Sequence, residues 1–438
     1  MPDPEPAGLD APPGLSRARR AVPLAMRYPL FRRYWFGLLS SVFGYRMWQF
    51  AQYWLVYELT GSALYLGLVG LSEAAPAIVL NLFGGAAADR MDKRRLVIIT
   101  ELCAALVIGA LLALVVTDTV MAWNVLVAVA VVSGLSSFNQ PARLALYPDY
   151  LDRDALMSGV ALNTVVWQST RIVGPAVAGL VIAATDTYVA MIVSCAGMIG
   201  MALVMRTLPA SPGRPGSADT KPLRDIAEGL RYIRTHRIFL FLIGMTFFNS
   251  FFAMSFIPLM PVFAVEVLDV GVSGQGALIG ASGVGSLLFT ALLSARSSNR
   301  GTGLLLIGGA VLCGSSLIAF ALTSLYVGAF PLALGLIFVV GMAMSMYMVP
   351  VMTAMQLMVP DELRGRVMGL WNLTYNIIPL GALFAGVLAT GVGAPWAVAI
   401  GGIVVITFAL GPALLNSEVR RLGSILDERS AGQRTVME

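Results

Sequence analysis

Three charged side chains lie near the middle of long apolar stretches of the sequence: Arg46, Glu73 and Arg171. Charged groups are costly in apolar surroundings, and those that occur there usually pair with each other or serve a function. A carboxylate in such surroundings takes up a proton more readily because low dielectric disfavours its charged form, whereas a nearby guanidinium favours the anion. Glu73, with Arg46 or Arg171 as its partner, could therefore bind a proton in one arrangement and release it in another.

A purely structural role is the alternative for the same residues. Arg46 and Glu73 each lie near the middle of consecutive apolar stretches, so a static ion pair could fix the register of two helices. Removal of one partner from a static buried pair would unfold or mislocalise the protein, because it leaves a buried charge unpaired. A coupling residue, in contrast, could be neutralised without loss of the fold.

Polar and aromatic side chains accompany these charges at helical spacing. Gln49 and Tyr53 follow Arg46, and Asn163 and Trp167 precede Arg171, so each set falls on about one face of a helix. In the second half of the chain, comparable sets are centred on asparagines. These sets predict the lining of a substrate cavity, although aromatic residues at such spacing are more often ordinary packing. The candidate lining residues are Gln49, Tyr53, Asn163, Trp167, Phe248, Asn249, Phe252, Asn372, Tyr375 and Asn376.

The apolar stretches identify the class of protein. Of the 438 residues, 58% are hydrophobic and 12% are charged, whereas a soluble domain has about 25% charged residues. Each stretch is near the roughly 20 residues that a membrane-spanning helix requires, and a helix satisfies its own backbone hydrogen bonds in lipid. We therefore predict an all-α integral membrane protein with twelve transmembrane helices in two pseudo-symmetric six-helix bundles. The predicted spans are 34–57, 63–87, 96–116, 121–141, 158–183, 188–206, 238–264, 275–296, 303–322, 326–351, 367–389 and 395–415.

The basic residues predict the orientation of these spans. The two tails and the even-numbered loops hold 27 of the 29 Lys and Arg residues, with Arg143 and Arg153 assigned to the fourth loop. The odd-numbered loops hold none. Because cytoplasmic loops carry the excess of Lys and Arg, both termini are expected in the cytoplasm. This segregation also accounts for the net charge of +5 without a nucleic-acid partner.

The chain divides into two halves with tails and a linker. Pro148–Leu151, before span 5, recurs as Pro360–Leu363 before span 11, which indicates an internal repeat. Between the halves, Pro222–Arg237 is predicted to form an amphipathic helix on the membrane surface or against the bundle. The expected boundaries are a cytoplasmic tail 1–33, a six-helix bundle 34–206, a cytoplasmic linker 207–237, a six-helix bundle 238–415 and a cytoplasmic tail 416–438.

A short charged segment separates the second and third spans. Its motif residues are Gly85, Asp89, Arg90, Lys93 and Arg94. Their spacing resembles the loop between helices 2 and 3 of the major facilitator superfamily, with Asp92 where the family usually has glycine. The resemblance implies a gate in which Asp89 holds the ends of spans 2 and 11 together through the positive N-terminus of helix 11. The alternative is an ordinary positively charged turn with a helix-capping aspartate.

Span 5 carries a second motif, formed by Gly174, Pro175 and Gly179. Pro175 leaves the carbonyl of Arg171 without its helical hydrogen bond and tends to bend the helix. The stretch resembles the Gly-Pro motif of superfamily antiporters, with Ala178 where a glycine is usual, although an ordinary proline kink would have the same sequence. Three further stretches resemble the enterobactin-exporter and macrolide-efflux type within the superfamily: 31–35, 228–234 and 364–369.

This resemblance implies a secondary active transporter. The expected activity is proton-coupled antiport that exports small, largely apolar compounds such as drugs, siderophores or lipid-like molecules by alternating access. Its expected partners are the substrate, protons and the lipid bilayer, for a monomer in the inner (plasma) membrane. A carrier for a specific metabolite or lysolipid is the first alternative, and a non-transporting receptor or pore is the second.

Nothing in the sequence indicates an enzyme or a cofactor. Lys93 and Lys221 are the only lysines and neither follows a phosphate-binding loop, while His236 is the only histidine. The cysteines, at 103, 195 and 313, each lie inside an apolar stretch and are expected to be packing residues. We therefore expect no ATP-binding site, no metal site and no cofactor.

Overall fold

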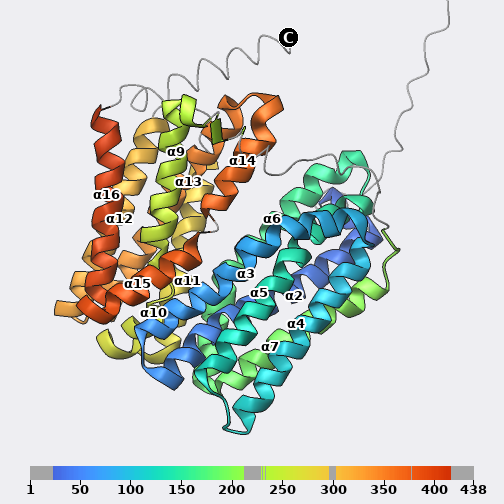
Figure 1. Cartoon of the computed structure of the whole chain (residues 1–438), viewed down its shortest axis with the longest axis horizontal. Helices are drawn as coiled ribbons and strands as arrows, with labels where there is room; N and C mark the ends of the chain where they lie inside the picture. Colours follow the sequence, from blue (N-terminus) through green and yellow to red (C-terminus); the bar gives the residue numbers. More distant parts are fainter. Residues whose placement is uncertain are drawn as a thin grey trace, which may run out of the picture.

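The computed structural model describes residues 23–211, 228, 230–231, 233–294, 302–375 and 377–415. Within these ranges the chain consists of helices joined by short turns, and no strand occurs among the described residues. The helices form two bundles that lie side by side, one from each half of the sequence (Figure 1). The predicted all-α membrane fold is therefore confirmed.

The N-terminal bundle contains six long helices. Helix α2 packs against α7 and α6, and α3 packs against α5. Short 3₁₀ turns, η1 (Leu24–Arg27), η2 (Tyr147–Tyr150) and η3 (Arg153–Ala155), lie at one end of the bundle. The helices are α2 (Pro29–Thr60), α3 (Ala63–Arg90), α4 (Lys93–Val116), α5 (Ala122–Leu146), α6 (Leu156–Ala184) and α7 (Thr187–Arg206).

The C-terminal bundle differs because two of its spans are interrupted. The predicted span 7 is a series of short segments: α9 (Arg237–Phe248), η4 (Asn249–Ala253), η5 (Met254–Phe256), α10 (Met260–Val262) and η6 (Phe263–Val267), of which η4 and η6 are π-helical. The predicted span 11 is split into α14 (Asp361–Tyr375) and α15 (Ile378–Val392). The continuous helices are α11 (Gly271–Ser294), α12 (Thr302–Tyr326), α13 (Phe330–Met358) and α16 (Ala394–Leu415).

Proline residues coincide with these interruptions. Pro261 occupies the first turn of α10 and Pro379 the first turn of α15. In the first turn a backbone N–H has no acceptor within the helix, so the missing N–H of proline costs no hydrogen bond. Span 7 is therefore not the single regular helix that its apolar run predicted. Broken helices and π-helical turns are frequent at functional sites of membrane proteins.

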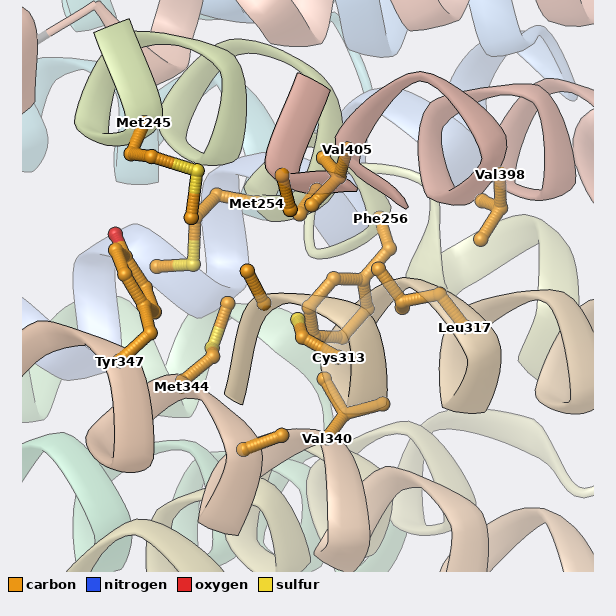
Figure 2. Close-up of a cluster of buried hydrophobic side chains, with 14 of the residues drawn as sticks. Met245, Met254, Phe256, Cys313, Leu317, Val340, Met344, Tyr347, Val398 and Val405 are labelled. Carbon is orange, nitrogen blue, oxygen red and sulfur yellow. The ribbon is translucent and has the colours of Figure 1, made fainter. Parts of the chain in front are cut away.

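Methionine and aromatic side chains, with smaller aliphatic ones, fill the core of the C-terminal bundle. Figure 2 shows Met245, Met254 and Phe256 of span 7 together with Cys313 of α12 and Tyr347 of α13. In lipid, packing of this kind, and not the hydrophobic effect, holds helices together. Cys313 is fully buried, in agreement with its predicted role as a packing residue.

The two ends of the molecule differ in charge. At one end, which we call the basic end, α3 ends at Arg90, α4 begins at Lys93 and η3 begins at Arg153. The turns at the opposite, acidic end contain Asp118 and Asp186. The separation of Lys and Arg along the sequence therefore corresponds to a separation in space.

The bundles contact each other in the half nearest the acidic end. Helix α3 packs against α15, and α6 packs against α11. Glycines allow these contacts, since a methyl carbon added at Gly276 would lie 2.8 Å from the carbonyl oxygen of Pro175, and one at Gly386 would lie 2.6 Å from that of Ala63. Toward the basic end, where α14 lies, the bundles diverge (Figure 1). We call the acidic end closed and the basic end open, because the bundles contact each other near the first and diverge toward the second.

Only the last part of the predicted linker helix falls among the described residues. There, Ile233 is buried and Leu230 is 46% exposed, and Glu228 forms a 2.6 Å ion pair with Arg366 of α14. This part of the linker therefore packs on the C-terminal bundle. Most of the predicted amphipathic helix and most of both predicted tails (1–22, 212–227 and 416–438) lie outside the described residues.

Candidate substrate and coupling site

Glu73 is held by neutral side chains of the neighbouring helix. Its carboxylate accepts hydrogen bonds from the Gln52 amide at 2.5 Å and from the Tyr53 hydroxyl at 3.4 Å. On the other side of α3, the Ser133 hydroxyl of α5 donates to the backbone carbonyl of Glu73 at 2.6 Å. Helices α2 and α5 thus fix both the carboxylate and the backbone of this residue.

Arg46 lies on α2 and does not form an ion pair with Glu73 in this structure. Its guanidinium donates to Gln49 Oε1 at 2.6 Å and lies over the ring of Trp167, 5.8 Å from the centroid. Arg171 is half-buried on α6, one helical turn beyond Trp167, and it also forms no ion pair with Glu73. The three candidate coupling residues therefore all lie in the N-terminal bundle, but neither guanidinium is paired with the carboxylate of Glu73.

The Gly-Pro motif of α6 provides two close helix contacts. A methyl carbon added at Gly174 would lie 2.5 Å from Cβ of Arg46, and one added at Gly179 would lie 2.7 Å from the carbonyl oxygen of Val272 in α11. Pro175 lies inside the continuous helix α6. Gly174 thus positions Arg46, and Gly179 with Pro175 forms part of the contact between the bundles.

A buried ion pair that the sequence analysis missed lies nearer the basic end. Glu101 of α4 pairs with Arg143 of α5, and both residues are less than 10% exposed. Glu101 also accepts from Ser41 at 3.0 Å and from Asn139 at 3.1 Å. The assignment of Arg143 to the fourth loop is wrong, because α5 continues to Leu146 and buries this arginine. The signal available in the sequence was Glu101 itself, an acid inside the predicted span 96–116.

The predicted gating motif separates into two parts. Asp89 and Arg90, at the end of α3, are exposed, and Gly85 is half-buried on the same helix. Lys93 instead pairs with Asp149 at 3.2 Å, and Arg94 donates to the carbonyl of Leu208 at 2.7 Å. The two basic residues therefore tie neighbouring turns of their own bundle together and leave Asp89 at the open end.

Asp92 stands where the resembled family usually has glycine, and the structure explains its presence. Its backbone φ of −61° needs no glycine, and its side chain accepts hydrogen bonds from the backbone N–H groups of Arg94 and Arg95. Asp92 is thus the N-cap of α4, a position that aspartate favours.

The other residues predicted to line a substrate cavity lie in two different parts of the structure. Asn163 and Trp167 line a cavity of about 210 Å³ together with Tyr34 of α2. Phe248 stacks on Phe408 of α16, with ring centroids 4.0 Å apart, and Phe252 contacts Phe384 of α15, with centroids 5.5 Å apart.

Asn249 is only 1% exposed, inside the C-terminal bundle. The side chains of Asn372 and Tyr375, and all of Asn376, lie outside the described residues. Of the predicted cavity residues, the structure therefore brings Asn163 and Trp167 together at one cavity.

Comparison with known protein families shows what this chain is similar to. A family model described as Major Facilitator Superfamily matches residues 34–380. The chain is similar to multidrug efflux pump Tap of Mycolicibacterium fortuitum, with 29% identity over 78% of this chain and 84% of that protein. It is also similar to macrolide efflux protein A of Streptococcus pyogenes, with 24% identity over 90% of this chain and 97% of that protein. A shorter match of 33% identity, over 30% of this chain and 33% of the relative, joins it to the staphyloferrin A transporter of Staphylococcus aureus.

Solved structures with the same fold include two bacterial transporters. A bacterial homologue of the human lysosomal transporter Spinster, in an inward-facing and unoccupied conformation, superposes with a TM-score of 0.68 and 13% identity, covering 93% of this chain and 99% of that chain. A bacterial homologue of the iron transporter ferroportin, in an inward-facing state, gives a TM-score of 0.64 and 13% identity, covering 87% of this chain and 98% of that chain. At such low identity these likenesses establish the fold alone.

Proposed function

Because this chain belongs to the Major Facilitator Superfamily and is therefore a multi-pass membrane transporter and not an enzyme, we propose that it exports small, largely apolar compounds in exchange for protons. The efflux relatives support the direction and the substrate class, since two of them are named for multidrug and macrolide efflux. The proposal places the basic end in the cytoplasm, in accordance with the excess of Lys and Arg there.

The contrast between two buried carboxylates carries the proton-coupling part of the proposal. Glu101 is paired with Arg143 and bonded to Ser41, so protonation of Glu101 would leave a buried guanidinium without its counter-ion. Glu73 is bonded to Gln52 and Tyr53, which are neutral. Protonation of Glu73 therefore breaks no ion pair. Glu73 is the carboxylate of this bundle suited to gain and lose a proton during transport.

Arg46 makes the binding of a proton to Glu73 depend on the conformation of the bundle. It lies on the same helix as Gln52 and Tyr53, and in this structure its guanidinium is directed to Gln49 and Trp167. A movement that brings Arg46 toward Glu73 would favour the anion and release the proton. Arg171, one turn from Trp167 on α6, is the second candidate for this role.

The observed closure at the acidic end fits the state in which substrate enters from the cytoplasm. The α3–α15 and α6–α11 contacts close the acidic end, while Asp89 is exposed at the open end. In the opposite state, Asp89 would meet the N-terminus of α14, whose backbone N–H groups carry partial positive charge. The gate is thus proposed to be released in this structure and engaged when the basic end closes.

Transport by Glu73→Gln in sealed vesicles tests this function. A susceptibility panel in an efflux-deficient host first identifies a transported compound, and counterflow of that labelled compound separates a carrier from a receptor or a pore. Under an imposed pH gradient, wild-type protein should accumulate the compound, whereas Glu73→Gln should exchange it without responding to the gradient. Asp118→Asn, a change in an exposed turn at the acidic end, is the matched control. A Glu73→Gln variant that accumulates substrate in proportion to the gradient would exclude Glu73 as the coupling site.

A further inference from the structure

A cavity in the N-terminal bundle combines aromatic walls with polar groups that the fold does not satisfy. The cavity of about 210 Å³ lies between α2, α5 and α6. Its lining includes Tyr34, Gln140, Arg143, Leu144, Asn163 and Trp167. Gln140 and Leu144 are exposed, which shows that the cavity is accessible from outside the bundle.

Two buried polar atoms of this lining have no hydrogen-bond partner. Arg143 uses a terminal nitrogen for Glu101 and Ser41, but its Nε–H, although buried, donates to nothing, and Oδ1 of Asn163 is likewise buried without a donor. Arg143 as a whole is 7% exposed. Buried groups of this kind cost free energy unless something binds to them. One is a donor and the other an acceptor, and the two residues that carry them line the same cavity.

The charge balance determines what kind of group fits. The positive charge of Arg143 is already compensated by the carboxylate of Glu101. An added anion would leave this region with a net negative charge and would face the Asn163 oxygen, while an added cation would face the guanidinium. A neutral group with both a carbonyl oxygen and an N–H avoids both penalties, because the oxygen can accept from Nε of Arg143 and the N–H can donate to Asn163.

The aromatic walls are held in place before any ligand arrives. The Tyr34 hydroxyl donates to the backbone carbonyl of Arg143 at 3.4 Å, and the Trp167 ring lies against the Arg46 guanidinium. Rigid aromatic surfaces bind flat apolar bodies at a low entropic cost. We propose that this cavity binds uncharged compounds in which a primary or secondary amide is attached to an aromatic body.

This site rests on the proposed function but is separate from the coupling residue. Ser41, bonded to Arg143, and Gln52, bonded to Glu73, lie eleven residues apart on α2, which corresponds to about 16 Å along the helix axis. The cavity also lies in the half of the bundle that is open in this structure. It is thus the position at which an amide substrate entering from the basic end would first be held.

Calorimetric titration of the purified full-length protein in detergent tests this assignment without transport. The probes are 2-naphthamide, its N,N-dimethyl derivative, which lacks the N–H, and sodium 2-naphthoate, which carries the negative charge. The N,N-dimethyl amide should bind about tenfold more weakly than 2-naphthamide, as expected for one lost hydrogen bond, and 2-naphthoate should bind more weakly still. Asn163→Leu should abolish the preference for the amide N–H, whereas Gln168→Leu, which removes another amide of α6 outside the cavity, should preserve it.

Several results would overturn the assignment. These are tightest binding of 2-naphthoate, equal affinity for the two amides, an Asn163→Leu variant that retains the preference while remaining folded, or no binding of any probe. The melting temperature of each variant reports whether it is folded. Failure of the proposed function is distinguishable, because the response of Glu73→Gln to a pH gradient is measured independently of these affinities.

Discussion

The Glu101 carboxylate of α4 and the Arg143 guanidinium of α5 form an ion pair inside the N-terminal bundle, with both residues less than 10% exposed. Asn139 and Ser41 complete the hydrogen bonds of the carboxylate. This pair differs from the Glu73 site in that each charge has its counter-ion within one rigid group of helices. Its role is to hold α2, α4 and α5 together and to fix the wall of the cavity.

Removal of one member of this pair should destabilise the fold strongly. Glu101→Gln leaves the Arg143 charge buried and unpaired, so we expect the free energy of unfolding to fall by about 3–5 kcal/mol. The double variant Glu101→Leu with Arg143→Met removes both charges and should be more stable than Glu101→Gln. Denaturant titration in detergent measures both values. A Glu101→Gln protein as stable as wild type would contradict the structural role.

The acidic-end closure includes a hydrogen bond between the bundles, from the Tyr57 hydroxyl of α2 to Glu266 of η6 at 2.5 Å. Tyr57→Phe removes this bond and should shift the population toward the state open at the acidic end, by about fivefold for a bond of about 1 kcal/mol. Thr119, in the turn before α5, and Tyr326, the last residue of α12, are both exposed at that end. Distances between spin labels at these two positions should then include a longer component. Tyr188→Phe, at the exposed start of α7, serves as the control and should leave the distances unchanged.

The gate proposed for Asp89 predicts the opposite shift. Asp89→Asn should weaken the closed basic end, reduce transport and leave the protein folded. Leu144, which is 58% exposed and lines the cavity, reports the change: Leu144→Cys should react faster with an impermeant reagent from the basic side when Asp89 is replaced. Asp154→Asn, another exposed acid at the same end, should have no effect. Equal labelling and full transport in Asp89→Asn would exclude the gate.

Orientation in the membrane can be tested at two exposed positions. Asp154 lies at the basic end and Thr119 at the acidic end. In intact cells, an impermeant thiol reagent should label Thr119→Cys but not Asp154→Cys, in a background without the three native cysteines. Thr187 is unsuitable as an outer position because it is 2% exposed. The reverse labelling pattern would place the basic end outside.

The sequence was sufficient to predict the spans because apolar length and Lys/Arg segregation are properties of the chain itself. Pro261 and Pro379 coincide with interruptions of the helices. The sequence could not reveal the π-helical turn that begins at Asn249, because only packing selects it. Arg143 was misplaced for a related reason. A charge near the end of a span resembles a loop residue until its partner, Glu101 on another helix, is known.

The sequence proposes members of a candidate site, but it could not predict their contacts. Arg46, Glu73 and Trp167 were identified from charge and helical spacing, and all lie in the N-terminal bundle. Their partners depend on how the helices are rotated. Glu73 is bonded to Gln52 and not to an arginine, and Arg46 lies over Trp167. Asp92 departs from the glycine that is usual in the resembled motif, and only the structure shows that its side chain caps α4.

The central claim is that substrate and protons move in opposite directions and that Glu73 carries the proton. The most direct test places purified protein in vesicles that contain a pH-sensitive dye and are loaded with a compound identified by the susceptibility panel. As the compound leaves the vesicles, wild-type protein should acidify the interior, and Glu73→Gln should allow the compound to exchange without a change in pH. Alkalinisation of the interior, or acidification that persists in a folded Glu73→Gln variant, would contradict this account.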